Sequence, residues 1–208
     1  DDASELGKLG VEIPKEVIPI GIDVSRIEVK ALKTDGIHLY HLGAMDWEPN
    51  LDGINWFVHD IWPQIEAKLP EVRCSLAGRK MPASLLAYSS KNLKVEGEVL
   101  SVVEFVSDKN VAIIPLRSGS GMRVKIVEAL AFGKVVITTS LGASGIPFED
   151  GKNILIANTP DEFVEKIALL SKNPERISSI SSEARKLAEQ EFDLKNLSSK
   201  LTYFYANL

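Results

Sequence analysis

The stretch NVAIIPLRSGSGMRVKIVEALAFGK, residues 110–134, predicts a strand, a glycine loop and a helix in direct succession. Its apolar start has the length typical of a strand buried on both faces of a parallel sheet. Gly119 and Gly121 lack a Cβ, so they allow unusual backbone angles and close approach of a ligand to the main chain. The helical pattern begins near Met122, and Gly133 stands where helices usually end. This order is typical of a phosphate-binding loop.

Arg123, Lys125 and Glu128 are the charged residues of this otherwise apolar helix. Cations in the first turns of a helix are unfavourable by a few tenths to about 1 kcal/mol each, and a bound phosphate or diphosphate would offset that cost. Glu128 falls on roughly the same face as Lys125, where its carboxylate could accept hydrogen bonds from two sugar hydroxyls. The alternative is a solvated Lys125–Glu128 pair worth about 0.2–0.5 kcal/mol, with Arg123 on the surface.

Length and composition indicate one α/β domain: the chain has 208 residues, of which 45% are hydrophobic. A net charge of −5 argues against nucleic acid as a general partner, although Arg117, Arg123 and Lys125 gather around one loop. Cys74 is the only cysteine, which rules out an internal disulfide. No run approaches 18 apolar residues and no signal peptide opens the chain, so the expected location is the cytoplasm.

Strands and helices are expected to alternate, which implies right-handed βαβ units and a Rossmann-like parallel sheet flanked by helices. The residues before this alternation resemble the tail of a helix and then a short strand at Val17–Ile20. Further strands are predicted at Ile37–Leu42, Val72–Ala77, Leu93–Glu96, Val135–Thr139 and Asn153–Ala157. Helices are predicted at Asn55–Leu69, with Pro63 kinking or dividing it, and at residues 159–170, 175–191 and 194–205.

Glycines follow several of the predicted strands, at the edge of the sheet where ligands bind in folds of this kind. Gly43, Gly78 and Gly97 share this position with the Gly119 loop, and together they predict a crevice, although strand-end glycines are also common for geometric reasons. Trp47, in the loop after the first strand, either shapes the pocket or anchors the loop by packing. His41 also lies near this edge, but a hydrogen-bonded structural role is favoured for it.

Residues 118–146, SGSGMRVKIVEALAFGKVVITTSLGASGI, resemble the donor-site segment of group 1 glycosyltransferases, the retaining sugar-nucleotide enzymes of the two-domain GT-B fold. The resemblance covers nearly the whole chain and implies that Glu128 holds the donor ribose. The family usually has a second Glu eight positions earlier, which contacts the transferred sugar, and this chain has Ser120 there. A subset of the family carries this Gly-Ser-Gly-x-Arg-x-Lys form, so the departure leaves open how the sugar is held.

The resemblance implies transfer of a hexose from a nucleoside diphosphate sugar to an acceptor hydroxyl, with retention and with no separate cofactor. Arg123 and Lys125, with Arg79 a further candidate, would stabilise charge on the leaving diphosphate. Backbone near Glu96–Glu98 would read the base. We therefore expect the donor to contact Gly43, Trp47, Glu96, Gly97, Ser120, Gly121, Met122, Arg123 and Glu128. No H-E-x-x-H, cysteine–histidine cluster or isolated Asp-x-Asp occurs, which predicts metal independence.

The same resemblance implies one half of a GT-B enzyme. Residues 1–30 would be a junction segment, residues 31–208 the donor-binding domain, and the N-terminal acceptor domain would be a partner absent from this chain. Peripheral membrane attachment through that missing domain stays open. Because closing the cleft between two domains positions the acceptor and excludes water, this chain alone is expected to bind the donor without turnover.

Two other classes of function remain as alternatives. Ser120 in place of the usual Glu would also suit a nucleotide-binding regulatory or scaffolding domain without transfer activity. An epimerase or a phosphorylase on a related fold is less favoured. An epimerase would need additional acid–base carboxylates, and a phosphorylase would often need a cofactor-anchoring lysine, neither of which the sequence identifies.

Overall fold

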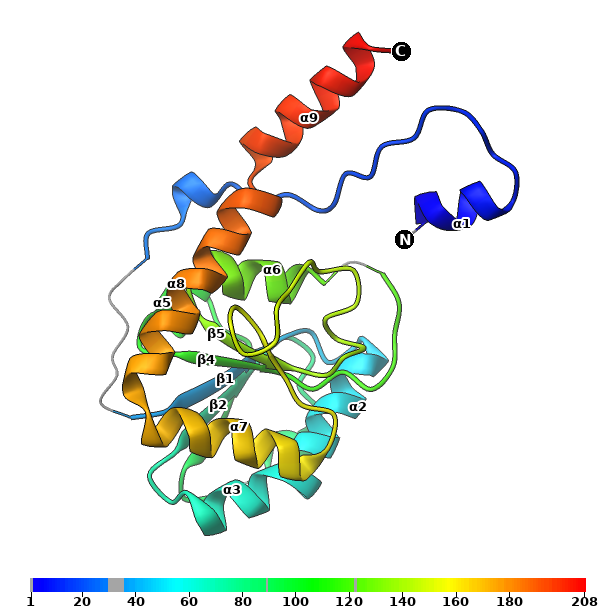
Figure 1. Ribbon diagram of the computed structural model, residues 1–208. Coiled ribbons are helices and arrows are strands. Elements are labelled where there is room, and N and C mark those ends of the chain that lie inside the picture. Colours follow the sequence, from blue (N-terminus) through cyan, green and yellow to red (C-terminus); the bar gives the residue numbers. More distant parts are fainter. Residues whose placement is uncertain (1, 30–35, 89, 122) are drawn as a thin grey trace.

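The computed structural model describes residues 2–29, 36–88, 90–121 and 123–208, which form a parallel sheet between two layers of helices (Figure 1). Six strands lie in the order β3-β2-β1-β4-β5-β6. They are β1 (His38–Leu42), β2 (Arg73–Ala77), β3 (Leu93–Gly97), β4 (Val111–Ile114), β5 (Val135–Thr138) and β6 (Leu155–Ile156). All neighbouring pairs are parallel. The chain order reverses between β1 and β4, so a crevice is expected beyond the carboxyl ends of these two strands.

Helices cover both faces of the sheet, each with its own hydrophobic cluster. One face packs against α2 (Glu48–Trp56), the π-helical turn Phe57–Ile61, α3 (Trp62–Lys68) and α7 (Pro160–Lys172). The other face packs against α5 (Val102–Ser107), α6 (Val124–Ala131) and α8 (Pro174–Glu191). The remaining helices are α1 (Asp2–Lys8), α4 (Ala83–Leu86), α9 (Leu194–Ala206) and the 3-10 turn Val24–Arg26. This is the expected Rossmann-like arrangement.

The central strands are the most deeply buried elements, as their apolar composition predicts. Every residue of β4 and β5 is buried, because side chains that point to opposite faces both meet a helical layer. Leu39 of β1 faces the α2–α7 cluster while its neighbour Tyr40 faces the α5–α8 cluster. The sequence thus places β4 correctly, and α6 follows it after a nine-residue loop, residues 115–123.

The aromatic helix begins earlier than predicted and is divided at the expected place. Trp47 precedes the first turn of α2, so Glu48–Asn50 are helical and do not belong to a loop. The π-helical turn Phe57–Ile61 separates α2 from α3, where Pro63 stands at one of the first two positions. Proline has no N–H and clashes with the preceding turn, and a wider π turn accommodates both effects.

The short strand predicted at Val17–Ile20 is wrong, since no strand is described in this segment. The nearby chain makes one β-bridge instead, in which Ile22 lies beside Asp193 at the junction of α8 and α9. A four-residue apolar run forms a strand only where a free strand edge accepts it, and none lies beside it here. The sequence reading also missed α4 and α5, which are four and six residues long.

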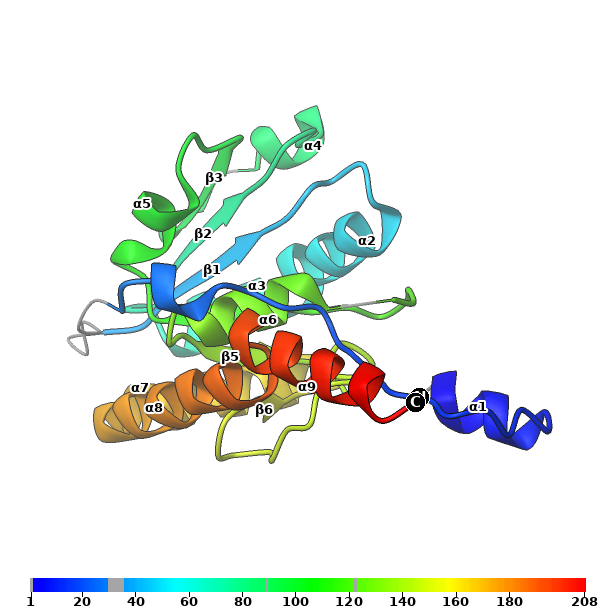
Figure 2. The same ribbon diagram turned by 90° about the horizontal axis from the view of Figure 1, so that it is seen from above.

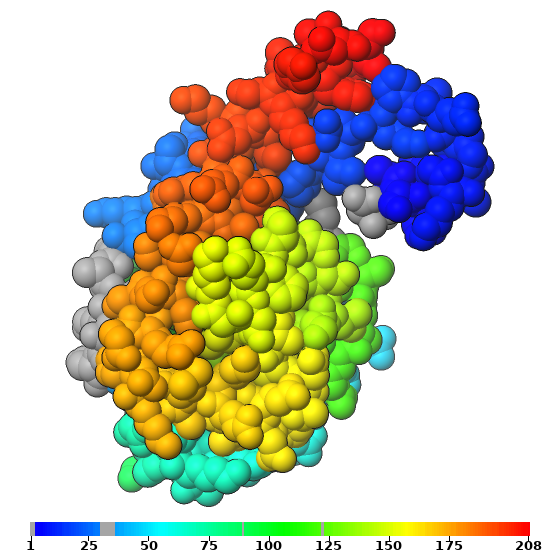
Figure 3. Space-filling view, in the orientation of Figure 1, coloured from blue at the N-terminus to red at the C-terminus, as the bar shows by residue number. Residues whose placement is uncertain are grey.

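Both terminal segments of the chain lie outside the layered body. Side chains of α8 and α9 contact the segment between Glu16 and Ile27, while α1 and the end of α9 project away from the sheet (Figures 2 and 3). The proposed boundary between a junction segment and a donor domain falls at residues 30–35, which lie outside the described residues. In the described part of the chain, no helix is both long and apolar enough to span a bilayer.

The carboxyl ends of β1, β2 and β3 are held together through their glycines. The Gly43 N–H donates to Ala77 O at 3.0 Å, and the Gly78 N–H donates to Gly97 O at 2.7 Å. A Cβ on Gly78 would lie 1.7 Å from Gly43 O, well inside van der Waals contact with rigid backbone. Only glycine therefore allows β1 and β2 to approach this closely at the rim.

We predict that Gly78→Ala lowers the free energy of unfolding by about 3 kcal/mol, because two backbones must separate to admit one methyl group. Gly145→Ala is the matched control. A Cβ there meets nothing within 4 Å, and only its positive φ of 81° is unfavourable, at about 1–2 kcal/mol. Urea unfolding of both variants tests this prediction, and equal losses of stability would contradict it.

Candidate functional site

A large cavity lies beyond the ends of β1 and β4, at the predicted crevice. Its volume is about 790 Å³. It is bounded by the loop after β1, the start of α2, the end of β4 and the first two turns of α6. The residues that line it include Ala44, Trp47, Asn50, Arg79, Arg123, Lys125 and Glu128. Three of the side chains expected to bind a donor, Trp47, Arg123 and Glu128, therefore meet here.

The glycine loop adopts the backbone that its sequence predicts. Gly119 and Gly121 have φ angles of 105° and 90°, which glycine adopts at little cost. A Cβ on Gly119 would lie 3.2 Å from the Trp47 ring, so the loop packs directly against Trp47. Ser120 is exposed at the tip of this loop. Met122, the remaining loop residue expected to bind the donor, lies outside the described residues.

Arg123 is the most constrained charge at the site. It is 7% exposed and immediately precedes α6, one residue before the helix that the sequence predicts to include it. One terminal nitrogen donates to Gly119 O at 3.2 Å and to Leu141 O at 3.1 Å. Its Nε and other terminal nitrogen are buried and have no hydrogen-bond partner among the described residues. Burial lowers the pKa of Arg123, and an anion in the cavity would satisfy both nitrogens.

Lys125 reaches the same cavity from the first turn of α6. Its ammonium donates to the amide oxygen of Asn50 and lies 5.4 Å from the centroid of the Trp47 ring. Burial lowers the Lys125 pKa to about 8; Glu128 opposes this shift and Arg123 adds to it. Asn50 is 3% exposed and donates in turn to Ala44 O at 2.8 Å. Asn50 thus connects the loop after β1 to α6, a role that the sequence reading did not assign.

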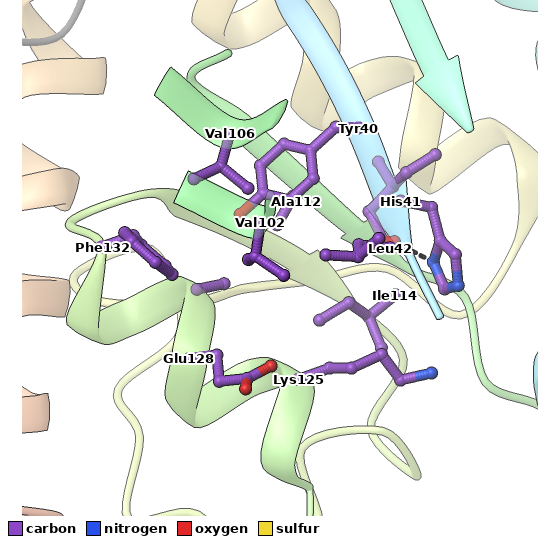
Figure 4. A pocket seen from close by; sticks show the side chains of 12 residues that line it. Tyr40, His41, Leu42, Val102, Val106, Ala112, Ile114, Lys125, Glu128 and Phe132 are labelled. Atoms are coloured by element: carbon purple, nitrogen blue, oxygen red, sulfur yellow. Dashed lines mark hydrogen bonds between the residues drawn. The ribbon is translucent and has the colours of Figure 1, made fainter. Parts of the chain in front are cut away.

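Glu128 lies between the large cavity and a smaller, mainly apolar pocket (Figure 4). The smaller pocket is formed by Tyr40 from β1, Val102 and Val106 from α5, and Phe132 after α6. Burial raises the Glu128 pKa, and Lys125 opposes that shift. Lys125 and Glu128 line the same two pockets, as their spacing of three residues predicts.

Some predicted site residues lie elsewhere. Glu96 lines a different hollow on the outer edge of the sheet, where it approaches Lys94 at 3.5 Å. Gly97 ends β3, which β2 and β1 separate from β4, and its carbonyl accepts from the Gly78 N–H. Arg117 does not join the other cations, because its guanidinium pairs with Asp52 and lies 5.3 Å from the Trp56 ring. Arg79 does line the cavity, with a 3.9 Å contact to Asp46.

The two histidines of β1 face opposite sides of the sheet, as predicted. His38 lies 3.1 Å from the Ser75 hydroxyl, while His41 lies 2.9 Å from Ile113 O and lines the smaller pocket. Across the part of the chain that the structure describes, no three His, Cys, Asp or Glu residues gather in a way that would hold a metal ion. Metal independence of the reaction remains a prediction.

The family of the chain follows from comparison with known proteins. Residues 36–173 match the sequence profile of the group 1 glycosyl transferases, so the chain belongs to this family. The matched region starts before β1 and ends after α7, and it includes the cavity with Arg123, Lys125 and Glu128. The fold and the sequence thus agree with the resemblance seen in residues 118–146.

Known proteins similar to this chain are distant in sequence. A protein of Klebsiella pneumoniae, described as an uncharacterized 44.6 kDa protein in the cps region, is 22% identical over 169 residues. That match covers 77% of this chain and 44% of the relative, so the chain spans less than half of the relative's length.

Three solved structures illustrate the shared fold. Sucrose-phosphate synthase from Thermosynechococcus elongatus is 16% identical, with a TM-score of 0.75 over 99% of this chain and 56% of that protein. HepE from Anabaena, in complex with UDP and glucose, is 16% identical, with a TM-score of 0.70 over 100% of this chain and 61% of that protein. The C-terminal domain of a group 1 glycosyl transferase from Francisella tularensis is 16% identical, with a TM-score of 0.68 over 84% of this chain and 100% of that domain. The fold is therefore that of one GT-B domain.

We predict that Lys125 titrates near pH 8, far below a surface lysine, which titrates near pH 10.4. NMR titration of ¹³C-labelled lysine side chains measures this. Lys134 is buried and its pKa is also lowered to about 8. Among the described lysines, two transitions are therefore expected near pH 8, and Lys125→Met and Lys134→Met should each remove one of them. If Lys125→Met leaves both transitions in place, the ammonium is not desolvated as described.

Proposed function

We propose that this chain binds the diphosphate and ribose of a sugar nucleotide, as the donor half of an enzyme that transfers a hexose to an acceptor hydroxyl. The observation that carries this proposal is the buried Arg123 guanidinium, which leaves two nitrogens without a partner in a cavity shared with Lys125 and Glu128. Membership of the group 1 family supports it. So does the fold shared with HepE, which was crystallised with UDP and with UDP-glucose.

The diphosphate would lie against Arg123 and Lys125. Both cations stand at the N-terminal end of α6, where the helix dipole also attracts an anion. The ribose would lie toward Glu128, whose carboxylate could accept hydrogen bonds from two adjacent hydroxyls. Glu128 is one helical turn beyond Lys125, a spacing of about 5–6 Å between Cβ atoms that suits neighbouring parts of one nucleotide.

The reaction would break the bond between the anomeric carbon and the diphosphate oxygen, and the electron pair would stay on the leaving phosphate. Arg123 and Lys125 would stabilise that growing charge by electrostatics already in place before the reaction. The bound diphosphate would also raise the Lys125 pKa and keep its ammonium charged. Retention and metal independence are parts of this proposal; two cations beside the diphosphate support the second.

Nucleotide binding is the first prediction from this function. Titration calorimetry with UDP, GDP and ADP should find one diphosphate that binds in the micromolar to millimolar range, about −8 to −4 kcal/mol. Arg123→Ala should weaken that binding about ten- to a hundredfold, because a charge-assisted hydrogen bond contributes about 1.5–3 kcal/mol. Glu128→Gln should weaken it less, since an amide keeps one acceptor for the ribose.

Arg117→Ala is the matched control for Arg123→Ala. Arg117 lies six residues earlier, is exposed and is paired with Asp52 outside the cavity. Its loss should leave nucleotide affinity unchanged within about twofold, as is usual for exposed ion pairs. Equal effects of the two substitutions would show that general surface charge, and not the buried guanidinium, attracts the nucleotide.

Sugar transfer is a separate prediction. This chain is expected to bind the donor without transferring its sugar, whereas a longer protein with an acceptor domain transfers it. Radiolabelled or mass-spectrometric detection of the glycosylated acceptor tests both proteins. A regulatory domain is the second candidate, favoured by exposed Ser120 at the position of the usual Glu. Nucleotide binding without transfer by the longer protein would support that candidate, and transfer by the isolated chain would contradict the first.

A further inference from the structure

His41 is a buried polar side chain of the smaller pocket, which shares Lys125 and Glu128 with the proposed donor cavity, and only one of its two nitrogens is paired. It is 1% exposed, and its Nδ1 lies 2.9 Å from Ile113 O. Its Nε2 is buried and has no hydrogen-bond partner among the described residues. A polar atom left unpaired in this way is costly, at about 1–3 kcal/mol, so the nitrogen is expected to serve a ligand.

The hydrogen bond to Ile113 determines which nitrogen carries the proton. A carbonyl oxygen can only accept, so Nδ1 is the protonated donor and the neutral ring presents a lone pair at Nε2. Burial first, and then the nearby Lys125 ammonium, lower the His41 pKa to about 3, which keeps the ring neutral at physiological pH. His41 Nε2 is therefore a hydrogen-bond acceptor only.

Three nitrogens from three elements converge beside Gly43. The position that a Cβ would take on Gly43 lies 2.9 Å from His41 Nε2, 2.9 Å from Lys125 Nζ and 3.0 Å from Asn50 Nδ2. Lys125 and Asn50 are donors, and each has an N–H beyond the bond described for it. In Figure 4 the His41 ring and the Lys125 ammonium extend to the same end of the pocket, away from the Glu128 carboxylate.

The arrangement of two donors and one acceptor is selective for one kind of ligand group. A hydroxyl accepts two hydrogen bonds and donates one, so it satisfies all three nitrogens. A phosphate oxygen at neutral pH presents only lone pairs and would repel the lone pair of His41 Nε2. The diphosphate therefore suits Arg123 better, whose unpaired nitrogens are donors, and a hydroxyl suits the mixed group of nitrogens beside Gly43.

We propose that His41 Nε2 accepts a hydrogen bond from a hydroxyl of the transferred sugar, to which Lys125 and Asn50 donate. This inference rests on the proposed function and specifies how the same site holds its sugar. It addresses the departure at Ser120, because that exposed side chain replaces the Glu with which the family usually contacts the sugar. His41 is thus a residue that favours a sugar nucleotide over the free nucleotide.

The test compares the affinities for nucleotide and sugar nucleotide in matched histidine variants. Calorimetry with UDP against UDP-glucose, and GDP against GDP-mannose, gives the gain in affinity due to the sugar. His41→Asn keeps an amide nitrogen that can bond Ile113 O but lacks Nε2, whereas His41→Gln places an amide oxygen near the Nε2 position. His38→Asn is the control, since His38 lies on the same strand and faces the opposite side.

We expect His41→Asn to reduce the gain due to the sugar about three- to tenfold, the effect of losing one neutral hydrogen bond. His41→Gln should restore part of it, and His38→Asn should preserve it. A gain that is unchanged in His41→Asn, or equal losses for nucleotide and sugar nucleotide, would overturn the proposal. Absence of nucleotide binding by the unmodified chain would instead defeat the proposed function, and this inference with it.

A measurement without substitution at the site keeps the proposal testable if His41→Asn does not fold. The chain has three histidines, and NMR of ¹⁵N-labelled imidazole distinguishes protonated from unprotonated nitrogens. The ¹⁵N signal of the unprotonated His41 Nε2 is the one that His38→Asn and His59→Asn both retain. Its chemical shift should change on addition of the sugar nucleotide, and much less on addition of the free nucleotide. Equal shifts with both ligands would overturn the proposal.

Discussion

Buried Arg123 and partly buried Lys125 place two positive charges where the N-terminal end of α6 is already positive, and the surrounding rim is built around this constraint. Among the described residues, Arg123 is held by the carbonyls of Gly119 and Leu141, which belong to two different loops. Lys125 is held by the neutral amide of Asn50, and Glu128 offsets its charge only in part. Such an arrangement favours an anion in the cavity, because the helix, both cations and the loop all present donors to it.

The topology explains how such distant residues come together. Asn50 and Lys125 are 75 residues apart, and they belong to helices that cover opposite faces of the sheet. Both helices start at the same edge, because β1 and β4 are adjacent parallel strands whose connections leave in opposite directions. The crevice therefore receives side chains from both layers. Gly43 leaves room for this contact, because a Cβ there would lie 2.9 Å from Lys125 Nζ and 3.0 Å from Asn50 Nδ2.

The family motif and the particular chain contribute different parts of the site. The loop, Arg123, Lys125 and Glu128 belong to the segment that resembles group 1 enzymes, and we propose that they bind the diphosphate and the ribose. His41 and Asn50 lie outside that segment and add an acceptor and a donor next to Lys125. Ser120 is exposed on the loop. We therefore propose that His41 on β1 and Asn50 on α2 bind the sugar in its place.

The sequence alone determined the elements whose hydrophobic pattern is strong: β4, β5, α6 and the division of the aromatic helix at Pro63, because burial and proline act locally. It also identified Arg123, Lys125 and Glu128, since their charges stand out on an apolar helix. Only the tertiary structure decided which cations share the cavity. Arg117 and Arg123 look equivalent in sequence, yet Arg117 pairs with Asp52 outside the cavity, while Arg123 is buried and pairs with no carboxylate of the described residues. Contacts between distant segments, as for Asn50 and His41, have no local signal, because they depend on how the sheet brings two helical layers to one edge.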